Sequence, residues 1–208
     1  MGEYVGAAVL FDMDGVLVDS GSSIREGVTA WARERFLDPA HVLEHAHGRT
    51  DHDLARIVAP HLDPAEEAER IQAQEIAHGA TVRAMPGAAG LLTEMETRGR
   101  SWAVVTSAGR TLALSRLSTL GLPAPRVLVT AEDVEAGKPD PGPYLLGAER
   151  VGADPSVCVV VEDSPNGVAA GAAAGMAVVA VATTTGPGEL AQATAVVPDV
   201  STAASLLL

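Results

Sequence analysis

Residues 7–19 have the sequence Ala-Ala-Val-Leu-Phe-Asp-Met-Asp-Gly-Val-Leu-Val-Asp. The apolar run has the length of a buried strand, and Gly15 marks where that strand ends. Asp12 and Asp14 point the same way, because side chains alternate along a strand. Their charges repel unless a cation, a proton or a substrate compensates, which makes the pair a candidate functional site. The alternative is a helix N-cap or an Asx-turn, in which Asp binds its own backbone.

After residue 84 the sequence alternates between helical and strand patterns. We predict strands at 102–105, 127–130, 157–161 and 176–181, with helices at 88–98, 110–120, 143–151 and 168–174, while 195–197 and 202–207 close the chain. Such alternation predicts an α/β fold with a parallel, doubly wound sheet. In these sheets ligands bind at the carboxyl ends of the strands.

Residues 21–83 differ, because they contain no strand pattern. Ser22 and Ser23 can cap a first helix, and residues 53–58 form a short one. A longer helix begins at Asp63-Pro64, with Asp at the cap and Pro in the first turn. We therefore predict a helical insert, residues 18–83, in a core made of residues 1–17 and 84–208.

The composition is that of an ordinary globular protein. The chain has 208 residues, 47% of them hydrophobic and 20% charged, which suits one domain with a modest insert. No apolar run approaches the roughly 18 residues of a membrane span, and Glu3 without a basic segment argues against a signal peptide. The single cysteine, Cys158, excludes an intrachain disulfide. We expect a soluble, cytoplasmic protein.

The charges limit the possible partners. A net charge of −13 argues against nonspecific nucleic-acid binding, which needs many Lys and Arg. An anionic ligand must therefore be held by a few local cations. The chain has thirteen arginines and one lysine, Lys138. Either this position needs a compact ammonium rather than a planar guanidinium, or one surface lysine has persisted by chance.

Two more predicted strands end in side chains that can hold a phosphate or a metal. Thr106 and Ser107 follow one strand, Glu162 and Asp163 follow another, and Lys138 lies in a loop before the helix at 143. As alternatives, the hydroxyls could cap the next helix and the acids could be solvated loop residues.

Four stretches, in this order, resemble the motifs of the haloacid dehalogenase-like (HAD) hydrolases. They are Asp12-Met13-Asp14-Gly15-Val16, Thr106-Ser107, Gly137-Lys138-Pro139 and Glu162-Asp163-Ser164-Pro165-Asn166-Gly167. The insert lies between the first two, as in the subfamily with a helical cap. Within that group the chain is similar to sugar-phosphate and glycerol-phosphate phosphatases and to beta-phosphoglucomutase. The resemblance implies a Rossmann-like HAD core with a cap inserted after the first strand.

The resemblance also implies a reaction. A Mg²⁺-dependent phosphatase of this family hydrolyses a small phosphorylated sugar or polyol through an aspartyl-phosphate. Asp12 would be the nucleophile, and Asp14 would protonate the leaving alcohol and then activate water. Thr106, Ser107 and Lys138 would bind the phosphoryl group. Asp12, the backbone carbonyl of Asp14, and Asp163 would bind Mg²⁺, with Glu162 just behind them.

Two other functions stay open. A phosphosugar mutase like beta-phosphoglucomutase is one, although that enzyme has a cap lysine near the position of His47 and this insert has no lysine. A phosphometabolite-binding regulator without catalysis is the other, although binding alone does not require Asp12 beside Asp14. Phosphonoacetaldehyde hydrolases also use a cap lysine, and haloacid dehalogenases lack the aspartate at the position of Asp14.

Residues 47–54 resemble the cap loop that faces the core site in the sugar phosphatases. Arg49 would bind a substrate hydroxyl or second anionic group, with Asp51, His47 or His52 nearby; the alternative for Arg49 is an ion pair within the cap. His41 and His45 fit a polar helix face better than a zinc site, since the cap has no cysteine. We expect a small phosphorylated metabolite as partner and a monomer or weak dimer. The sequence does not fix the natural substrate.

Overall fold

The computed structural model describes residues 3–4, 6–46 and 48–208. Its centre is a six-stranded sheet in the order β5-β4-β1-β6-β7-β8, with every neighbouring pair parallel. The strands are β1 (Ala8–Phe11), β4 (Trp102–Val105), β5 (Leu128–Val129), β6 (Cys158–Glu162), β7 (Ala177–Val181) and β8 (Ala195–Val197). The predicted doubly wound parallel sheet is confirmed. Because β1 lies between β4 and β6, the carboxyl ends of these three strands are neighbours.

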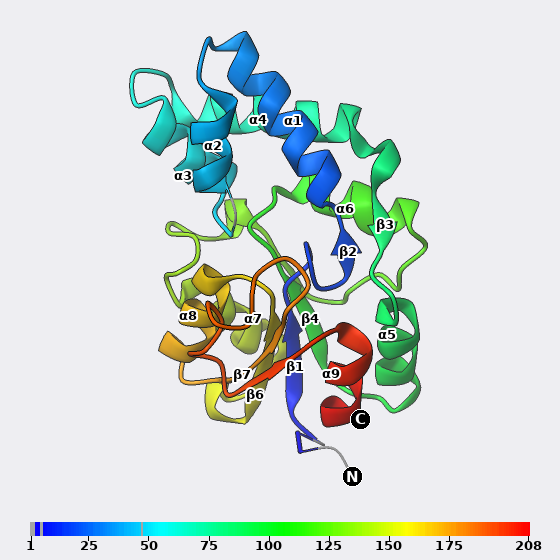
Figure 1. The fold of residues 1–208 in the computed structure, drawn as a ribbon. Coiled ribbons are helices and arrows are strands. Elements are labelled where there is room, and N and C mark those ends of the chain that lie inside the picture. Colours follow the sequence, from blue (N-terminus) through cyan, green and yellow to red (C-terminus); the bar gives the residue numbers. More distant parts are fainter. Residues whose placement is uncertain (1–2, 5, 47) are drawn as a thin grey trace.

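Helices cover both faces of the sheet (Figure 1). Val9 and Phe11 of β1 pack on one face against α5 (Ala88–Thr97), α6 (Arg110–Thr119) and α9 (Val200–Leu207). Ala8 and Leu10 pack on the other against α7 (Gly142–Val151) and α8 (Pro165–Ala173). Full burial of each large apolar side chain contributes about 1.5–3 kcal/mol, so β1 is fixed from both sides. Short 3₁₀ turns occur at Gly79–Thr81, Ala131–Asp133 and Pro155–Val157. No helix in the described ranges is long and apolar enough to cross a membrane.

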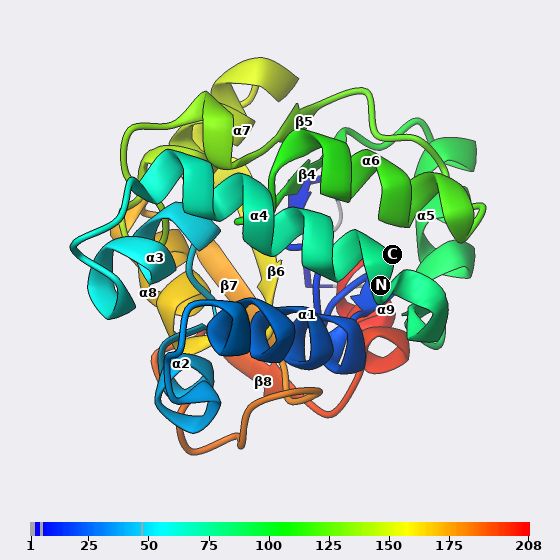
Figure 2. The ribbon, with the colours of Figure 1, turned by 90° about the horizontal axis from the view of Figure 1, so that it is seen from above.

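The helical segment, residues 18–83, lies over the carboxyl ends of the strands (Figures 1 and 2). It contains α1 (Gly21–Glu34), α2 (Pro39–Ala46), α3 (Asp51–Val58) and α4 (Pro64–Ala77), which pack around the fully buried Trp31. The chain enters through β2 (Val18–Asp19) and leaves through β3 (Arg83–Ala84), and these two strands pair antiparallel. Since β3 begins at Arg83, the prediction that residues 21–83 contain no strand is wrong at residue 83.

The starts of two helices bear on the sequence predictions. Asp63 caps α4 by accepting from the N–H groups of Ala65 and Glu66, as predicted. The predicted cap of α1 is wrong, because α1 begins at Gly21 and its N-cap position, Ser20, makes no side-chain cap bond. The hydroxyl of Ser23 instead donates to the carbonyl of Glu75, 2.9 Å away on α4. Ser23 therefore binds another helix rather than starting α1.

Candidate active site

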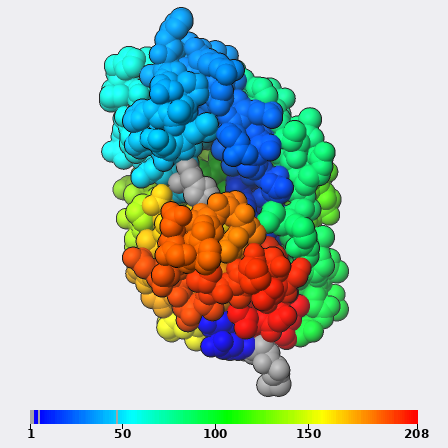
Figure 3. Space-filling model, in the orientation of Figure 1, coloured from blue at the N-terminus to red at the C-terminus, as the bar shows by residue number. Residues whose placement is uncertain are grey.

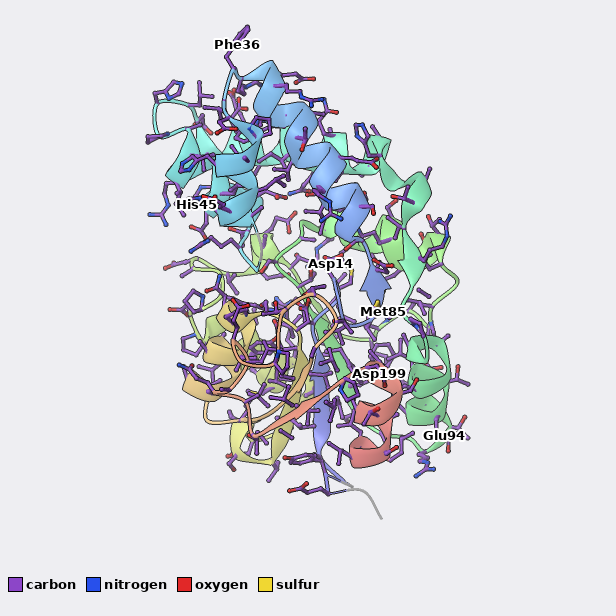
Figure 4. All side chains as sticks on the ribbon, in the orientation of Figure 1. Asp14, Phe36, His45, Met85, Glu94 and Asp199 are labelled. Carbon is purple, nitrogen blue, oxygen red and sulfur yellow. The ribbon has the colours of Figure 1, made fainter. Side chains whose placement is uncertain are left out.

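A cavity of about 600 Å³ lies between the sheet and the helical segment. Its lining includes most of the predicted site residues: Asp12, Asp14, Arg49, Asp51, Thr106, Ser107, Lys138, Glu162 and Asp163. Figure 4 shows Asp14 between the helical segment and the sheet. Figure 3 shows the surface hollowed between the blue helical segment and the orange C-terminal part. Residues from five separate stretches of sequence thus meet at one end of the sheet. His47, predicted beside Arg49, lies outside the described residues.

Lys138 joins two of these stretches. Its Nζ donates to Asp12 Oδ1 at 2.5 Å, to Glu162 Oε1 at 2.7 Å and to the carbonyl of Val105 at 3.1 Å. The side chain is buried, and burial alone would lower the pKa of Lys138. The Asp12 and Glu162 carboxylates outweigh this effect, so its pKa lies well above the usual value. The lone lysine is therefore a buried cation at the site and not a chance surface residue.

Glu162 is held by a full set of donors. Its Oε1 accepts from Lys138 and from the Tyr144 hydroxyl at 3.0 Å, while Oε2 accepts from the N–H groups of Asp163 and Ser164 and from the Ser164 hydroxyl. Burial raises the pKa of Glu162, but Lys138 and these hydrogen bonds outweigh it and keep the pKa below the usual value. An ionised glutamate at 1% exposure is not the solvated loop acid of the alternative interpretation.

The acidic atoms of the site fit a divalent cation. Ligand oxygens of Asp12, Glu162 and Asp163 lie within 4.8 Å of one another. Burial raises the pKa of Asp12 to about 8 against the effect of Lys138, and burial with Glu162 and Asp12 raises that of Asp163 well above its usual range. A cation bound between them would stabilise the ionised form of both carboxylates and so offset the cost of burying them. Because Glu162 is already fully bonded, Asp12 and Asp163 are the side chains with oxygens left to bind it.

Gly15 leaves room beside these acids. A Cβ at this position would lie 2.0 Å from Asp163 Oδ2, and the backbone has φ +81°. Only glycine satisfies both the close approach and the left-handed conformation easily. Asp163 also accepts from the hydroxyl of Thr184, and the Thr183 hydroxyl donates to the Gly15 carbonyl at 2.6 Å. The loop after β7 therefore supports the end of β1.

Thr106 and Ser107 follow β4 beside Asp12. The Thr106 hydroxyl accepts from the N–H of Ala108 at 3.1 Å, which leaves its proton available to a ligand. Helix α6 has Gly109 at its N-cap without a side-chain cap bond, so the helix-cap alternative is wrong.

Asp14 makes different contacts from Asp12. Its Oδ1 accepts from the Ser20 hydroxyl at 2.5 Å and from Arg116 Nη1 of α6 at 2.8 Å. The Nη2 of Arg116 donates to Glu75 Oε2 of α4 at 2.5 Å. Burial raises the pKa of Glu75 to about 7, against the opposing effect of Arg116. Among the hydrogen bonds of the described residues, none joins the Asp12 or Asp14 side chain to the neighbouring backbone, so the Asx-turn alternative is also wrong.

Arg49 and Asp51, which are predicted to contact the substrate from the helical segment, both line the cavity. Arg49 is half-buried, and its Nη1 donates to the carbonyl of His45 at 2.9 Å, so the alternative of an intracap ion pair has no support in the described residues. Asp51 is half-buried, and burial with Glu75 raises its pKa well above the usual value. On α2, possible metal-binding atoms of His41, Glu44 and His45 lie within 4.8 Å of one another. That spacing suits a metal ion as well as a polar helix face, so the polar face stays a prediction.

Arg116, Glu75, Ser20 and Tyr144 were not predicted. A signal for the first two exists, because each occupies a position on the apolar stripe of its helix. Arg116 lies with Leu112 and Leu117 among the buried residues of α6, and Glu75 lies on the same face of α4 as Ile71. A charge on such a stripe needs a buried partner.

Asp133 fixes the loop that leads to Lys138. It accepts from the N–H and hydroxyl of Thr130 and from Arg110 and Arg150 at 2.6 and 2.9 Å. Burial opposes this, but the bonds from Arg150 and Thr130 lower the pKa of Asp133 to about 2.

We expect Asp133→Asn to lower the free energy of unfolding at neutral pH by about 1–2 kcal/mol. This is less than the pKa shift alone implies, because solvent screens the charges of the exposed arginines. Since the pKa is lowered on folding, this stabilisation is present above the unfolded pKa near 3.9 and is lost as the pH falls toward 2. Urea unfolding of both proteins at about pH 7, 5 and 3 measures this difference. A difference that grows in acid would contradict the role of Asp133.

Comparisons with known proteins identify the family. The sequence model described as haloacid dehalogenase-like hydrolase matches residues 7–175. Hexitol phosphatase A of Escherichia coli K12 is 44% identical over 175 residues, which cover 83% of this chain and 81% of that protein. Glycerol-1-phosphate phosphohydrolase 2 of Saccharomyces cerevisiae is 34% identical over 187 residues, covering 85% and 75%.

The fold has matches among solved structures. A mutant of CbbY from Rhodobacter sphaeroides, in complex with xylulose-(1,5)bisphosphate, superposes with a TM-score of 0.85 over 100% of both chains at 23% identity. That likeness concerns the fold. The match of the family model over most of the sequence, together with the relatives above, shows that this chain belongs to the haloacid dehalogenase-like hydrolase family.

Proposed function

We propose that the chain is a Mg²⁺-dependent phosphatase that hydrolyses a small phosphorylated sugar or polyol through an aspartyl-phosphate on Asp12. The observation that carries the proposal is the contact of Lys138 Nζ with both Asp12 and Glu162, beside the carboxylate of Asp163. Membership of the hydrolase family and the two phosphatase relatives support a phosphoric monoester hydrolase. The names of those relatives favour polyol and sugar phosphates as substrates.

In the first step Asp12 attacks phosphorus and the alcohol leaves. The Thr106 hydroxyl and the Ser107 N–H donate to the phosphoryl oxygens, since both lie at the end of β4 in the cavity lining. Lys138 holds Asp12 in place and supplies positive charge next to the transferred group. Because its three N–H donors already have acceptors, its main effect on the phosphoryl group is electrostatic.

Asp14 serves both halves of the reaction. It gives a proton to the leaving alcohol, then takes one from the water that attacks the aspartyl-phosphate. Splitting one slow displacement into two steps is the gain from a carboxylate nucleophile. Phosphate then leaves with Asp12 restored.

Asp12, the backbone carbonyl of Asp14 and Asp163 would hold Mg²⁺. When bound, the ion neutralises phosphoryl charge and offsets the repulsion between the carboxylates. Asp12 is then ionised at neutral pH, as a nucleophile must be, although its burial raises its pKa in the metal-free protein.

We propose that residues 18–83 act as a cap over the core formed by residues 1–17 and 84–208. The hinge would lie where β2 and β3 pair, and closure would exclude water from the cavity. Arg49 and Asp51 would contact the part of the substrate away from phosphorus, with His47 as a further candidate. We expect a monomer or weak dimer in the cytoplasm, with no nucleic-acid or membrane partner.

A panel of sugar, polyol and nucleotide monophosphates tests the activity. We expect Mg²⁺-dependent phosphate release, fastest with polyol or sugar esters. Incubation with glucose 1-phosphate separates hydrolysis from a mutase, because a mutase yields an isomeric ester and not free phosphate. No release from any ester, with or without Mg²⁺, would contradict the proposal.

Magnesium binding has a readout independent of activity. Mg²⁺ at about 100 times its dissociation constant is expected to add roughly 2.7 kcal/mol to the free energy of unfolding. Asp163→Asn should remove most of this gain. Thermal unfolding with Mg²⁺ and with EDTA measures it, and Asp38→Asn, at an exposed helix cap that Asn fills equally well, is the control. Equal stabilisation of the Asp163 variant would place the ion elsewhere.

A further inference from the structure

The guanidinium of Arg116 connects the helical segment to Asp14. Arg116 belongs to α6 beside the sheet, Asp14 follows β1, and Glu75 belongs to α4 of the helical segment. The contacts of Nη1 with Asp14 and of Nη2 with Glu75, at 2.8 and 2.5 Å, join residues 102 and 41 positions apart in sequence. Figure 2 shows α4 lying alongside α6. We propose that Arg116 is a positioning residue, which aligns Asp14 for proton transfer only when Glu75 of the closed helical segment holds its other nitrogen.

Glu75 is a fixed anchor for this contact. Its carbonyl accepts from the Ser23 hydroxyl of α1, and its side chain is 5% exposed. Gly27 of α1 makes the room, since a Cβ there would lie 2.8 Å from the backbone and side chain of Glu75. The position of Glu75 is therefore set by the packing of α1 on α4, so that it moves with the helical segment as one body.

The Arg116 guanidinium orients the Asp14 carboxylate according to where Glu75 lies. A guanidinium is planar and rigid, so fixing Nη2 on Glu75 fixes the direction in which Nη1 points. The second group on Asp14 Oδ1, the hydroxyl of Ser20, lies at the start of the helical segment. Both donors to Asp14 among the described residues thus depend on where that segment sits. The Asp14 carboxylate has no other hydrogen bond there to orient it.

The position of Arg116 is difficult to explain as simple packing. Its side chain is 4% exposed, and its Nε has no hydrogen-bond partner among the described residues. A buried charge with an unsatisfied donor is costly, so the two carboxylates must offset it. Without Arg116, Asp14 and Glu75 would face each other across the boundary of the helical segment with no cation between them, beside Asp51. The segment would then open, or Asp14 would turn away from the leaving group.

The inference rests on the proposed function and is tested by comparing two leaving groups. With enzyme in excess over substrate, a single turnover reports ester cleavage alone. Sorbitol 6-phosphate has an alkoxide leaving group that needs the proton of Asp14, whereas p-nitrophenolate leaves without one. We expect Arg116→Met to slow cleavage of sorbitol 6-phosphate about 10²-fold, the cost of a displaced catalytic group, and that of p-nitrophenyl phosphate less than about tenfold.

Glu75→Gln is the companion variant, since it keeps the shape and removes the charge. It should give the same selective loss in weaker form, and the double variant should be no slower than Arg116→Met, because both act through one contact. Arg35→Met is the matched control: it breaks the partly buried Arg35–Glu67 ion pair, at 2.7 Å, within the helical segment, and should affect both esters equally.

The possible failures are distinguishable. Equal loss with both esters in the Arg116 and Glu75 variants would make Arg116 merely structural and overturn the inference. In steady-state assays of the same variants, a raised KM with unchanged kcat would make it a substrate-binding group, with the same consequence. A native protein that cleaves neither ester would contradict the proposed function itself. If Arg116→Met does not fold, the isosteric Glu75→Gln variant decides alone.

Discussion

Asp12→Asn protein is expected to fold normally and to release phosphate at least about 10⁴-fold more slowly than the native enzyme, because an amide cannot take the phosphoryl group. The substitution is nearly isosteric. It also removes one carboxylate from a cluster in which burial raises the pKa of Asp12 to about 8, so the metal-free protein should lose little stability. Steady-state phosphate release and thermal unfolding, measured on the same preparation, separate the two effects.

Asp38→Asn serves as the control for this substitution as well. Asp38 is a loop residue whose side chain accepts from the N–H of Ala40, and asparagine caps a helix equally well. Its activity and stability should match the native protein. Turnover by the Asp12 variant above about one-tenth of the native rate would mean that another group attacks phosphorus.

Lys138→Met is expected to affect stability and activity together. It leaves Asp12 and Glu162, both buried, without their shared ammonium, and breaking a buried ion pair from one side costs about 3–5 kcal/mol. The rate should fall about 10³-fold, since both the orientation of Asp12 and the charge beside the phosphoryl group are lost. Urea unfolding and steady-state kinetics measure the two losses.

The double variant Lys138→Met/Glu162→Gln shows whether the stability loss comes from an unpaired charge. Removing the glutamate charge as well should restore part of the stability while the enzyme stays inactive, because Asp12 still lacks its cation. A double variant less stable than Lys138→Met would indicate that the loss arises from packing against Tyr144, whose ring centroid lies 4.8 Å from the ammonium. A single variant as stable as the native protein would contradict the ion-pair account.

The sequence predicts the sheet and the meeting of the motifs because both follow from local patterns. Each apolar run forms a strand, alternation with helices makes the sheet parallel, and parallel strands present their carboxyl ends on one side. Asp12, Thr106 and Glu162 are therefore brought together without any knowledge of tertiary contacts. Lys138 could be selected because it is the only lysine. In the structure its Nζ lies 2.5 Å from Asp12 Oδ1.

The residues above the sheet could not be predicted in the same way. The contact of Arg116 with Glu75 depends on how α4 lies against α6, and no local pattern specifies that packing. The serines at the start of α1 illustrate the same limit. Ser22 and Ser23 suit a helix cap, yet α1 begins at Gly21, ahead of both, and the hydroxyl of Ser20 at the N-cap position binds Asp14 instead. Local rules describe the elements, whereas specificity depends on contacts between them.

The central claim is that Asp12 carries the phosphoryl group between substrate and water. The Asp14→Asn variant tests it most directly when mixed with radiolabelled p-nitrophenyl phosphate and Mg²⁺, since p-nitrophenolate leaves without an acid while the water step lacks its base. We predict that nearly one equivalent of label accumulates on the protein, that hydroxylamine releases it, and that peptide mapping places it on Asp12. Release of p-nitrophenol with no label on the protein, or label on another residue, would contradict the account.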